Sequence, residues 1–456
     1  MTSATSVFMI YCYIMKERTQ FGIAIPEVLL PKKIDTATWA VIACDQYTQS
    51  REYWAETESI VGNAPSTLNL ILPEVYLEDG DRNERIEKIH TAMNDYLASE
   101  IFQEKKGFIY IERETSEKRT RKGLICAIDL DAYEWKPGTK AVIRATEATI
   151  PERIPPRMKV RQGAALESPH IMLLVNDSER LLIEGVGEKI KKSTEASHSA
   201  PLYSGKLMQN GGYITGYEVS STQLIDYVYE SLEKIAEQNT SQDGSLFLFA
   251  VGDGNHSLAT AKAVWDEYKK SHPNEKEGTL RYALVEIVNI YDAGLTFEPI
   301  HRVVFNADPK KMLNYVAEKL HGRVTRVQDQ EVLEKSVNNS SADFGFSFLE
   351  DGKNACYLLH TEIKTLAVSS FQPVLDEYIR DAFDGNTDPI QIDYIHGSDE
   401  IFRLAKKENA TGILLPPIAK ECFFETIHKS GSLPRKSFSM GEANEKRYYM
   451  ECRKLL

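Results

Sequence analysis

Apolar residues recur along the chain with two periods, which predict helices in some segments and strands in others. In residues 83–102, Ile86, Ile89 and Met93 repeat at helical spacing, and residues 221–237 show the same period. Residues 246–251 form a continuous apolar run, which is typical of a strand buried on both faces. Segments of the two kinds alternate to the C-terminus.

This alternation predicts mixed sheets with packed helices. We expect strands at residues 39–43, 107–112, 123–129, 140–144, 170–176, around 202, 213–218, 246–251, 344–349, 355–359 and 411–415. We expect helices at residues 48–61, 83–102, 178–190, 221–237, 371–383 and 398–408, and further helices that begin near residues 257 and 419. The predicted fold class is therefore α/β in the broad sense (α+β), without the regular order of a doubly wound sheet.

The length of 456 residues predicts more than one domain, because domains usually hold about 100–150 residues. We expect an N-terminal α/β unit at residues 15–135, a core at 136–324 and a C-terminal α/β unit at 344–456. The polar stretch 325–343 is the clearest compositional break and is interpreted as a linker or insertion. Residues 1–14 are interpreted as a non-native or disordered extension.

The apolar segment 7–15 is too short to cross a bilayer, which takes about 20 residues. It has no basic residue before it and no small-residue cleavage site after it, so it is also a poor signal peptide. The six cysteines are scattered without a C-x-x-C pair, as in proteins of a reducing compartment. We therefore expect a cytoplasmic protein with no membrane partner.

The charge balance bears on the class of partner. The net charge is −13, from 67 acidic and 54 basic residues. Affinity for nucleic acid comes mainly from lysine and arginine at phosphates, so this balance argues against a nucleic-acid partner. A small-molecule ligand is favoured.

The strongest local signal for a binding site is the loop that follows the strand at 246–251. Its glycines allow close backbone approach and positive φ, and the helix N-terminus that follows is a ready site for phosphate or carboxylate, with Ser257 as a plausible cap. The alternative is a plain tight turn. Neither a Walker motif nor a G-x-G-x-x-G motif is present. The loop reads Gly252-Asp253-Gly254-Asn255-His256-Ser257.

Motifs at separated places along the chain resemble those of a known family. Residues 252–257 resemble its D-G-H-H-R loop, residues 299–304 its pattern ending in T-H-R, and residues 142–151 its I-P-H-E-x-T-L-P stretch. Residues 412–417 and 433–437 are similar to its L-L-x-P and M-P-x-K-S-T elements. Over residues 20–450 the sequence thus resembles the domain-of-unknown-function family ten-fifteen.

This family is distantly similar to archaeal free-serine kinases of the ParB/sulfiredoxin-like fold, and the resemblance implies such a fold for the core. In those kinases the glutamate of the H-E element is the proposed base. The resemblance implies Glu147 as the base, with Asp253 as a second catalytic residue, and Mg²⁺ with ATP or another phosphate donor; no metal-ligand set is assigned. It also implies a phosphate- or nucleotide-binding role for Gly252, Gly254, Asn255, His256 and Ser257.

The sequence departs from the family pattern at two positions. Thr146 stands where the family has the histidine before the glutamate, and Ser257 stands where it has the arginine of the loop. If that arginine grips a phosphate, this chain must supply the charge from elsewhere. We consider Arg144, Arg153 and Arg302 as its source.

Two weaker signals lie outside the loop. Arg153, Arg157 and Arg161 would share one face of a helix at 152–163, either closing over phosphates or pairing with acidic residues. The two prolines at 155 and 156 argue against a regular helix there. Asp45 follows the first expected strand, where ligands often bind in α/β proteins, a signal from position alone.

These observations lead to three functional hypotheses. The first is a small-molecule phosphotransferase, a nucleotide-dependent kinase of free serine or a similar hydroxylated metabolite. The second is a non-catalytic nucleotide- or phosphate-binding regulatory protein on the same fold. The third is a DNA-associated ParB-like factor, which the acidic charge disfavours.

Overall fold

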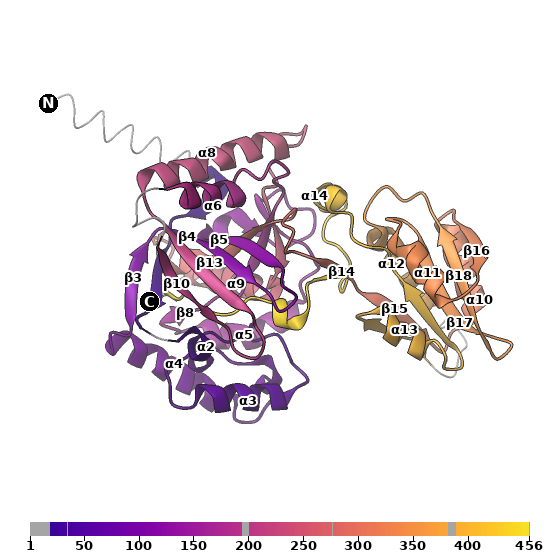
Figure 1. Cartoon of the computed structure of the whole chain (residues 1–456), viewed down its shortest axis with the longest axis horizontal. Coiled ribbons are helices and arrows are strands. Elements are labelled where there is room, and N and C mark those ends of the chain that lie inside the picture. The colour runs from indigo at the N-terminus through magenta and orange to yellow at the C-terminus, as the bar shows by residue number, and fades with distance from the viewer. Residues whose placement is uncertain (1–18, 34, 194–199, 276, 382–388, 456) are drawn as a thin grey trace. The chain divides into compact units, whose positions relative to one another are not determined.

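The computed structural model describes residues 19–33, 35–193, 200–275, 277–381 and 389–455, which form two compact units (Figure 1). The first unit runs to Leu295 and resumes at Glu442, and the second spans Thr296–Gly441. The expected extension 1–14 and the apolar segment 7–15 lie outside the described residues. Within the part of the chain that is described, no helix is both long and apolar enough to cross a bilayer.

A ten-stranded mixed sheet forms the centre of the first unit. Its strands are β1 (Ile23–Ala24), β4 (Phe108–Glu114), β5 (Thr120–Asp129), β6 (Tyr133–Glu134), β7 (Ile143–Ala145), β9 (Met172–Val175), β10 (Pro201–Lys206), β11 (Tyr213–Val219), β12 (Phe249–Asp253) and β13 (Tyr282–Asn289). They follow the order β10-β11-β4-β5-β13-β9-β12-β7-β6, and β1 pairs with β5. Strand β12 runs antiparallel to β9 and parallel to β7. The predicted class of mixed sheets with packed helices is confirmed.

Two helices pack on one face of this sheet. Helix α6 (Ile183–Lys192) and helix α8 (Thr222–Asn239) lie together over β4, β5 and β13 (Figure 1). In α8, Val228, Leu232 and Ile235 are fully buried in the same core as the strands. The helical period of apolar residues in this segment therefore marks the face that packs on the sheet.

A second apolar core lies among helices α3 (Arg51–Val61), α4 (Arg82–Ala98) and the C-terminal segment. It contains Trp39, Trp54, Met93 and Tyr448. The C-terminal segment joins this region by bridges from Cys452 to Leu29 and from Tyr448 to Ile42. Two short strand pairs complete it, namely β2 (Glu27–Pro31) with β3 (Phe102–Lys106) and β8 (Leu166–Glu167) with β22 (Arg453–Lys454).

The strand expected at residues 39–43 is not formed. Helix α2 (Thr36–Trp39) ends there, and Ile42 makes only an isolated bridge to Tyr448. All five residues of the segment are nevertheless buried. A short apolar run reports burial, and by itself it does not distinguish a strand from another buried segment.

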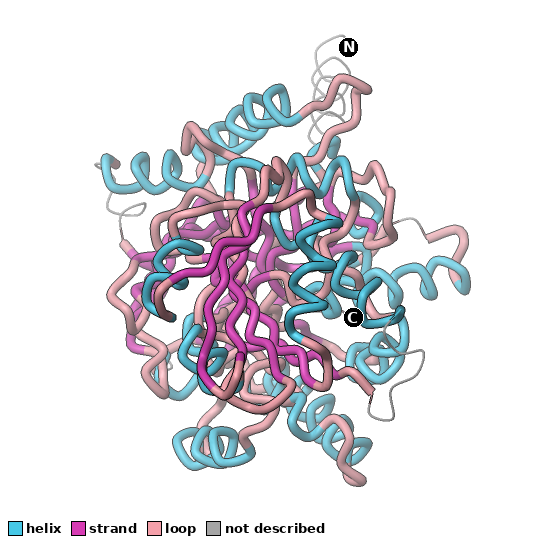
Figure 2. Tube along the Cα trace, turned by 90° about the vertical axis from the view of Figure 1, so that its right-hand side faces the viewer, coloured by secondary structure: helices cyan, strands magenta, loops and turns pink. Residues whose placement is uncertain are grey.

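The second unit is built on a six-stranded sheet whose strands run side by side in Figure 2. The strand order is β16 (Arg323–Val327), β18 (Lys353–His360), β17 (Phe344–Glu350), β20 (Ala410–Leu414), β15 (His301–Phe305) and β19 (Gln391–Ile395). Its helices are α10 (Pro309–Lys319), α11 (Gln330–Asn338), α12 (Ala367–Asp381), α13 (Ser398–Leu404) and α14 (Phe423–Ser430), and β14 (Phe297–Pro299) pairs with β21 (Phe438–Met440).

Helices cover both faces of this second sheet. The ring of Phe371 in α12 stacks on Phe344 of β17, with 4.6 Å between the ring centroids. The neighbouring residue Gly345 faces the opposite side, toward Leu333 and Val337 of α11. The sheet is therefore a buried layer between helices.

The polar stretch 325–343, interpreted from sequence as a linker or insertion, belongs to the folded second unit. It contains the end of the edge strand β16 and the whole of α11, whose Leu333 and Val337 are buried. Its polar composition comes from the exposed side of a short helix and from an edge strand. The boundary expected at residue 135 also falls within one sheet, because β5 pairs with β13.

Candidate functional site

The loop after β12 turns sharply into helix α9 (Asn255–Ser271). Gly254 precedes the helix in a left-handed conformation, with φ of 81°. A Cβ atom at this position would lie 3.0 Å from Cγ1 of Ile171, so only glycine fits without strain. Gly252 instead lies within the extended strand, and the helix begins at Asn255, two residues earlier than expected.

Because the N-cap residue is a glycine, it has no side chain to cap the helix. Ser257, expected to be the cap, lies in the first turn. The first turn of α9 also contains no acidic residue. The backbone N–H groups and the partial positive charge of this helix end are thus arranged as in proteins that hold phosphate or carboxylate at a helix N-terminus.

The segment that carries Glu147 is hydrogen-bonded to this loop. Strand β7 pairs in parallel with β12 and leads directly into residues 146–150. The hydroxyl of Thr146 donates to the carbonyl of Val251 at 2.6 Å, and the backbone N–H of Thr146 donates to Oδ1 of Asn255 at 3.3 Å. Glu147 is half-buried and follows this anchor directly.

A second hydrogen bond ties the segment to α9 at Ile150, three residues after Glu147. The backbone N–H of Ile150 donates to Nε2 of His256 at 3.3 Å. Glu147 thus lies between two points at which its segment is tied to the first turn of α9. The structure brings together the two segments that the sequence separates by more than a hundred positions.

Two cationic side chains adjoin the same loop from other parts of the chain. The ammonium nitrogen of Lys446 lies 3.4 Å from Oδ2 of Asp253. Nε2 of His170 lies 3.2 Å from the hydroxyl of Ser257. The lysine comes from the C-terminal segment and the histidine from the residues that precede β9, so only the fold places them here.

His170 is held by oxygen atoms at both ring nitrogens. Its Nδ1 lies 2.6 Å from the hydroxyl of Tyr449, and its Nε2 lies 3.5 Å from Oδ2 of Asp45. Burial disfavours the charged ring, but the Asp45 carboxylate outweighs burial and raises the pKa of His170 above its usual value. Although burial would raise the pKa of Asp45, His170 lowers it well below its usual range. The pair therefore favours a charged imidazolium beside the loop.

The three arginines considered as replacements for the loop arginine lie in different surroundings. Arg144 is buried, stacks on the ring of Phe247 and donates from Nε to the carbonyl of Ala141 at 2.8 Å. Arg153 is exposed at the end of a short 3₁₀ helix. Arg302 belongs to the second unit, where its Nε donates to Oε1 of Gln372 at 2.9 Å. Neither His170 nor Lys446 was among the residues expected from the sequence.

The neighbouring arginines of helix α5 (Ile154–Arg161) pair with acidic residues. Arg157 donates from Nε to Glu74 at 2.9 Å, and Arg161 bonds Glu167 at 2.6 Å. The two prolines occupy the first turn of the helix, where a missing N–H costs nothing. Of the two alternatives for these arginines, closing over phosphates or pairing with acidic residues, the structure shows the pairing for Arg157 and Arg161.

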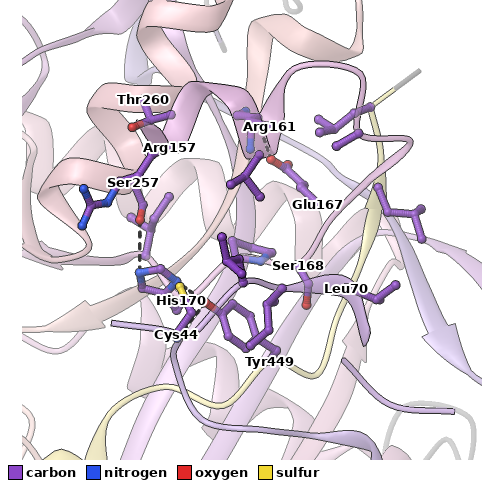
Figure 3. Close-up of a pocket in the computed structure, with 18 of the residues that line it drawn as sticks. Cys44, Leu70, Arg157, Arg161, Glu167, Ser168, His170, Ser257, Thr260 and Tyr449 are labelled. Carbon is purple, nitrogen blue, oxygen red and sulfur yellow. Dashed lines mark hydrogen bonds and ion pairs between the residues drawn. The ribbon is translucent and has the colours of Figure 1, made fainter. Parts of the chain in front are cut away.

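A cavity of about 160 Å³ lies beside the first turns of α9 (Figure 3). Ser257, His170 and Tyr449 meet at one part of its wall, where Figure 3 shows the hydrogen bond between Ser257 and His170. Neither Glu147 nor Asp253 lines it. Burial raises the pKa of the Cys44 thiol in this wall, so this cysteine stays in its neutral form.

No metal centre of the usual kind is built into the described parts of the chain. Among those residues, no group of three or more histidine, cysteine, aspartate or glutamate side chains is placed to hold a metal ion. Mg²⁺ does not require such a group, since it is commonly held by one or two carboxylates together with substrate phosphates. Asp253 is a carboxylate of this loop, and Glu147 belongs to the segment that is hydrogen-bonded to it.

The fold and this loop define an α/β protein with a candidate anion site at the start of a helix. A family model described as a protein of unknown function (DUF1015) matches residues 28–378, and the chain belongs to this family. The family membership expected from the motifs is confirmed. A search of curated proteins finds no match.

Several solved structures show a weak likeness to the chain. A free serine kinase in complex with AMP is 9% identical, with a TM-score of 0.35 over 74% of this chain and 92% of that chain. A mutant of a free serine kinase in complex with ADP is 9% identical, with a TM-score of 0.35 over 74% and 93%. A conserved hypothetical protein from Pyrococcus furiosus is 10% identical, with a TM-score of 0.33 over 70% and 90%. Likeness at this level carries no argument about the site.

Proposed function

We propose that the protein is a small-molecule phosphotransferase that transfers a phosphoryl group from a nucleotide, held at the first turn of α9, to a hydroxylated metabolite. The observation that carries the proposal is the joining of the Glu147 segment to this turn by hydrogen bonds at Asn255 and His256. Phosphoryl transfer needs an anion cradle, positive charge and a group that accepts the hydroxyl proton. The loop, its two cationic neighbours and Glu147 meet these needs.

The residues take separate roles in the transfer step. The acceptor's hydroxyl oxygen forms a bond to the terminal phosphorus of the donor, and the bond from that phosphorus to the bridging oxygen breaks. The donor leaves with that electron pair, and the proton of the acceptor passes to the carboxylate of Glu147. The N–H groups of α9, with His170 and Lys446, bind the phosphate oxygens.

Mg²⁺ with ATP or another phosphate donor completes the proposal. The ion would neutralise the phosphates when it is bound with the donor, and Asp253 is the carboxylate that we assign to it. Lys446 already neutralises part of the charge of Asp253, so the protein alone would hold a cation weakly there. An ion at Asp253 would therefore take most of its ligands from the donor phosphates. We place the reaction in a reducing compartment such as the cytoplasm, since the described cysteines are free thiols.

A regulatory protein that binds nucleotide or phosphate without catalysis is the second candidate function. The observation that favours it is Ser257, which stands where the family has an arginine and is engaged with His170. A site with less positive charge around the transferred phosphoryl group would bind its ligand and turn it over slowly or not at all.

Thermal unfolding with ATP, ADP, CTP or pyrophosphate in the presence of Mg²⁺ tests the phosphate site. A ligand at a hundredfold excess over its Kd stabilises the folded state by about 2.7 kcal/mol, and we expect such a shift for at least one donor. His256→Ala should reduce the shift, whereas His272→Ala, at the far end of α9, should not. No shift with any donor would contradict both candidate functions.

A further inference from the structure

The cavity beside α9 has an apolar wall and a polar end. Leu72, Met93, Val160, Ile171 and Leu455 contribute to the apolar wall. The hydroxyl groups of Ser257 and Tyr449 lie in the polar part, together with the ring of His170 (Figure 3). A ligand in this space would meet hydrocarbon over most of its surface and hydroxyl groups at one end.

The charged residues of the cavity wall are paired with one another. Arg157 bonds Glu74, and Arg161 bonds Glu167. The ring of His170 has the carboxylate of Asp45 as its partner. A charged ligand would compete with these pairs for their partners, and the apolar part of the wall offers its charge no partner, which is costly. The wall favours an uncharged occupant.

The volume limits the ligand to a small molecule. An engineered apolar cavity of about 150 Å³ in another protein takes up benzene. The present cavity, at about 160 Å³, has room for a body of similar size. It is too small to enclose a nucleotide, so we treat the phosphate donor and the occupant of this cavity as different molecules.

We propose that this cavity binds a small uncharged alcohol with a hydrocarbon body, its hydroxyl directed to Ser257. The assignment of this alcohol as the phosphoryl acceptor rests on the function proposed above: Ser257 also lies in the first turn of α9, where the donor phosphates would bind. Because Glu147 does not line the cavity, the acceptor would have to present its hydroxyl beyond the Ser257 end for the proton to pass to Glu147. Free serine fits this space poorly, since it has no hydrocarbon body to cover the apolar wall and its two charged groups would compete with the paired charges of the wall.

Binding of benzyl alcohol, 3-methyl-1-butanol and L-serine to the full chain, measured by saturation-transfer NMR without nucleotide, tests the proposal. We expect both alcohols to bind and serine not to bind. Ala164→Leu fills the cavity and should weaken alcohol binding at least tenfold. Ala165→Leu is the matched control, since Ala165 is buried in the same core without lining the cavity, and it should leave binding unchanged.

The outcomes separate this inference from the proposed function. Failure of both alcohols to bind, serine binding as strong as theirs, or equal alcohol binding in wild type and folded Ala164→Leu would each overturn the cavity assignment. A thermal shift with nucleotide would persist in those cases if the phosphotransferase proposal is correct. Alcohol binding with no nucleotide shift would support the cavity and overturn the acceptor role.

Discussion

The hydroxyl oxygen of Ser257 lies 3.2 Å from Nε2 of His170. The histidine comes from a segment 87 positions earlier in the chain. Its other nitrogen is fixed by Tyr449, and Asp45 favours its charged form. We interpret His170 as a residue that supplies positive charge next to a loop that carries no arginine or lysine of its own.

The first prediction concerns the pH dependence of stability. The pKa of His170 is raised in the folded state, so its contribution to stability is complete below the unfolded value of about 6.5 and is lost as pH rises through the folded value. His170→Asn should therefore destabilise the protein more at pH 6 than at pH 8.5. Urea unfolding followed by tryptophan fluorescence measures this, since all four tryptophans belong to the first unit.

The control for this prediction is His360→Asn. His360 also pairs with an aspartate, Asp343 at 3.1 Å, but it is partly exposed and belongs to the second unit. Its substitution should leave tryptophan-detected unfolding unchanged at both pH values. An equal loss of stability at pH 6 and pH 8.5 in His170→Asn would show that the ring is neutral in the folded state.

The second prediction concerns the geometry of the loop. Gly254→Ala places a side chain in a left-handed conformation, which costs about 1–2 kcal/mol, and also presses a methyl group against Ile171. We expect it to destabilise the first unit by more than that amount and to reduce the thermal shift with nucleotide. Gly244→Ala separates the two effects, because Gly244 has φ of 77° and an open space around it. Equal stability losses in the two variants would mean that the contact with Ile171 has no energetic weight.

The third prediction concerns the buried charges that hold the C-terminal segment. Glu286 is 1% exposed and bonds Nε of Arg447 at 3.0 Å, with Arg121 at 3.5 Å. Glu286→Gln would leave these arginines without their shared carboxylate, and removal of one partner from a buried ion pair typically costs about 3–5 kcal/mol. Because Arg447 lies between Lys446 and Tyr449, we also expect the variant to weaken nucleotide binding.

Glu277→Gln serves as the comparison for Glu286→Gln. Glu277 lies 3.9 Å from Arg281 and is 87% exposed, so its substitution should change stability by less than about 0.5 kcal/mol. The measurement is the free energy of unfolding of the two variants, obtained from urea titration. A change in Glu286→Gln as small as that in Glu277→Gln would show that the remaining partners of Arg447 are sufficient.

The sequence predicted the elements of the fold better than it predicted their partners. Segments with a clear helical period, such as residues 221–237, form helices because the buried stripe of α8 needs that spacing. The short apolar run at 39–43 was wrongly predicted as a strand, since its burial comes from contacts with residues near 448. Pairing between distant segments leaves no local pattern in the chain.

The same limit applies to the candidate site. The loop at 252–257 carries its own signal, because its glycines and the helix after it are adjacent in sequence. Asp45 had only its position to indicate it, and His170 and Lys446 had no signal at all. Their relation to the loop depends on β9 lying beside β12 and on the return of the C-terminal segment to the first unit.

The last prediction concerns the base. Glu147→Gln keeps the shape of the side chain and its hydrogen bonding but removes its basicity. General-base catalysis typically contributes about 10²–10⁴-fold, so turnover of a hydroxylated acceptor with a nucleotide donor should fall by that order while nucleotide binding, measured by calorimetry, persists. Glu152→Gln, an exposed carboxylate in the same segment, should have wild-type activity. If Glu147→Gln were as active as wild type, Glu147 would not be the base. If the wild-type protein bound nucleotide but phosphorylated neither serine nor simple alcohols with any donor, the regulatory function would take precedence over the transferase.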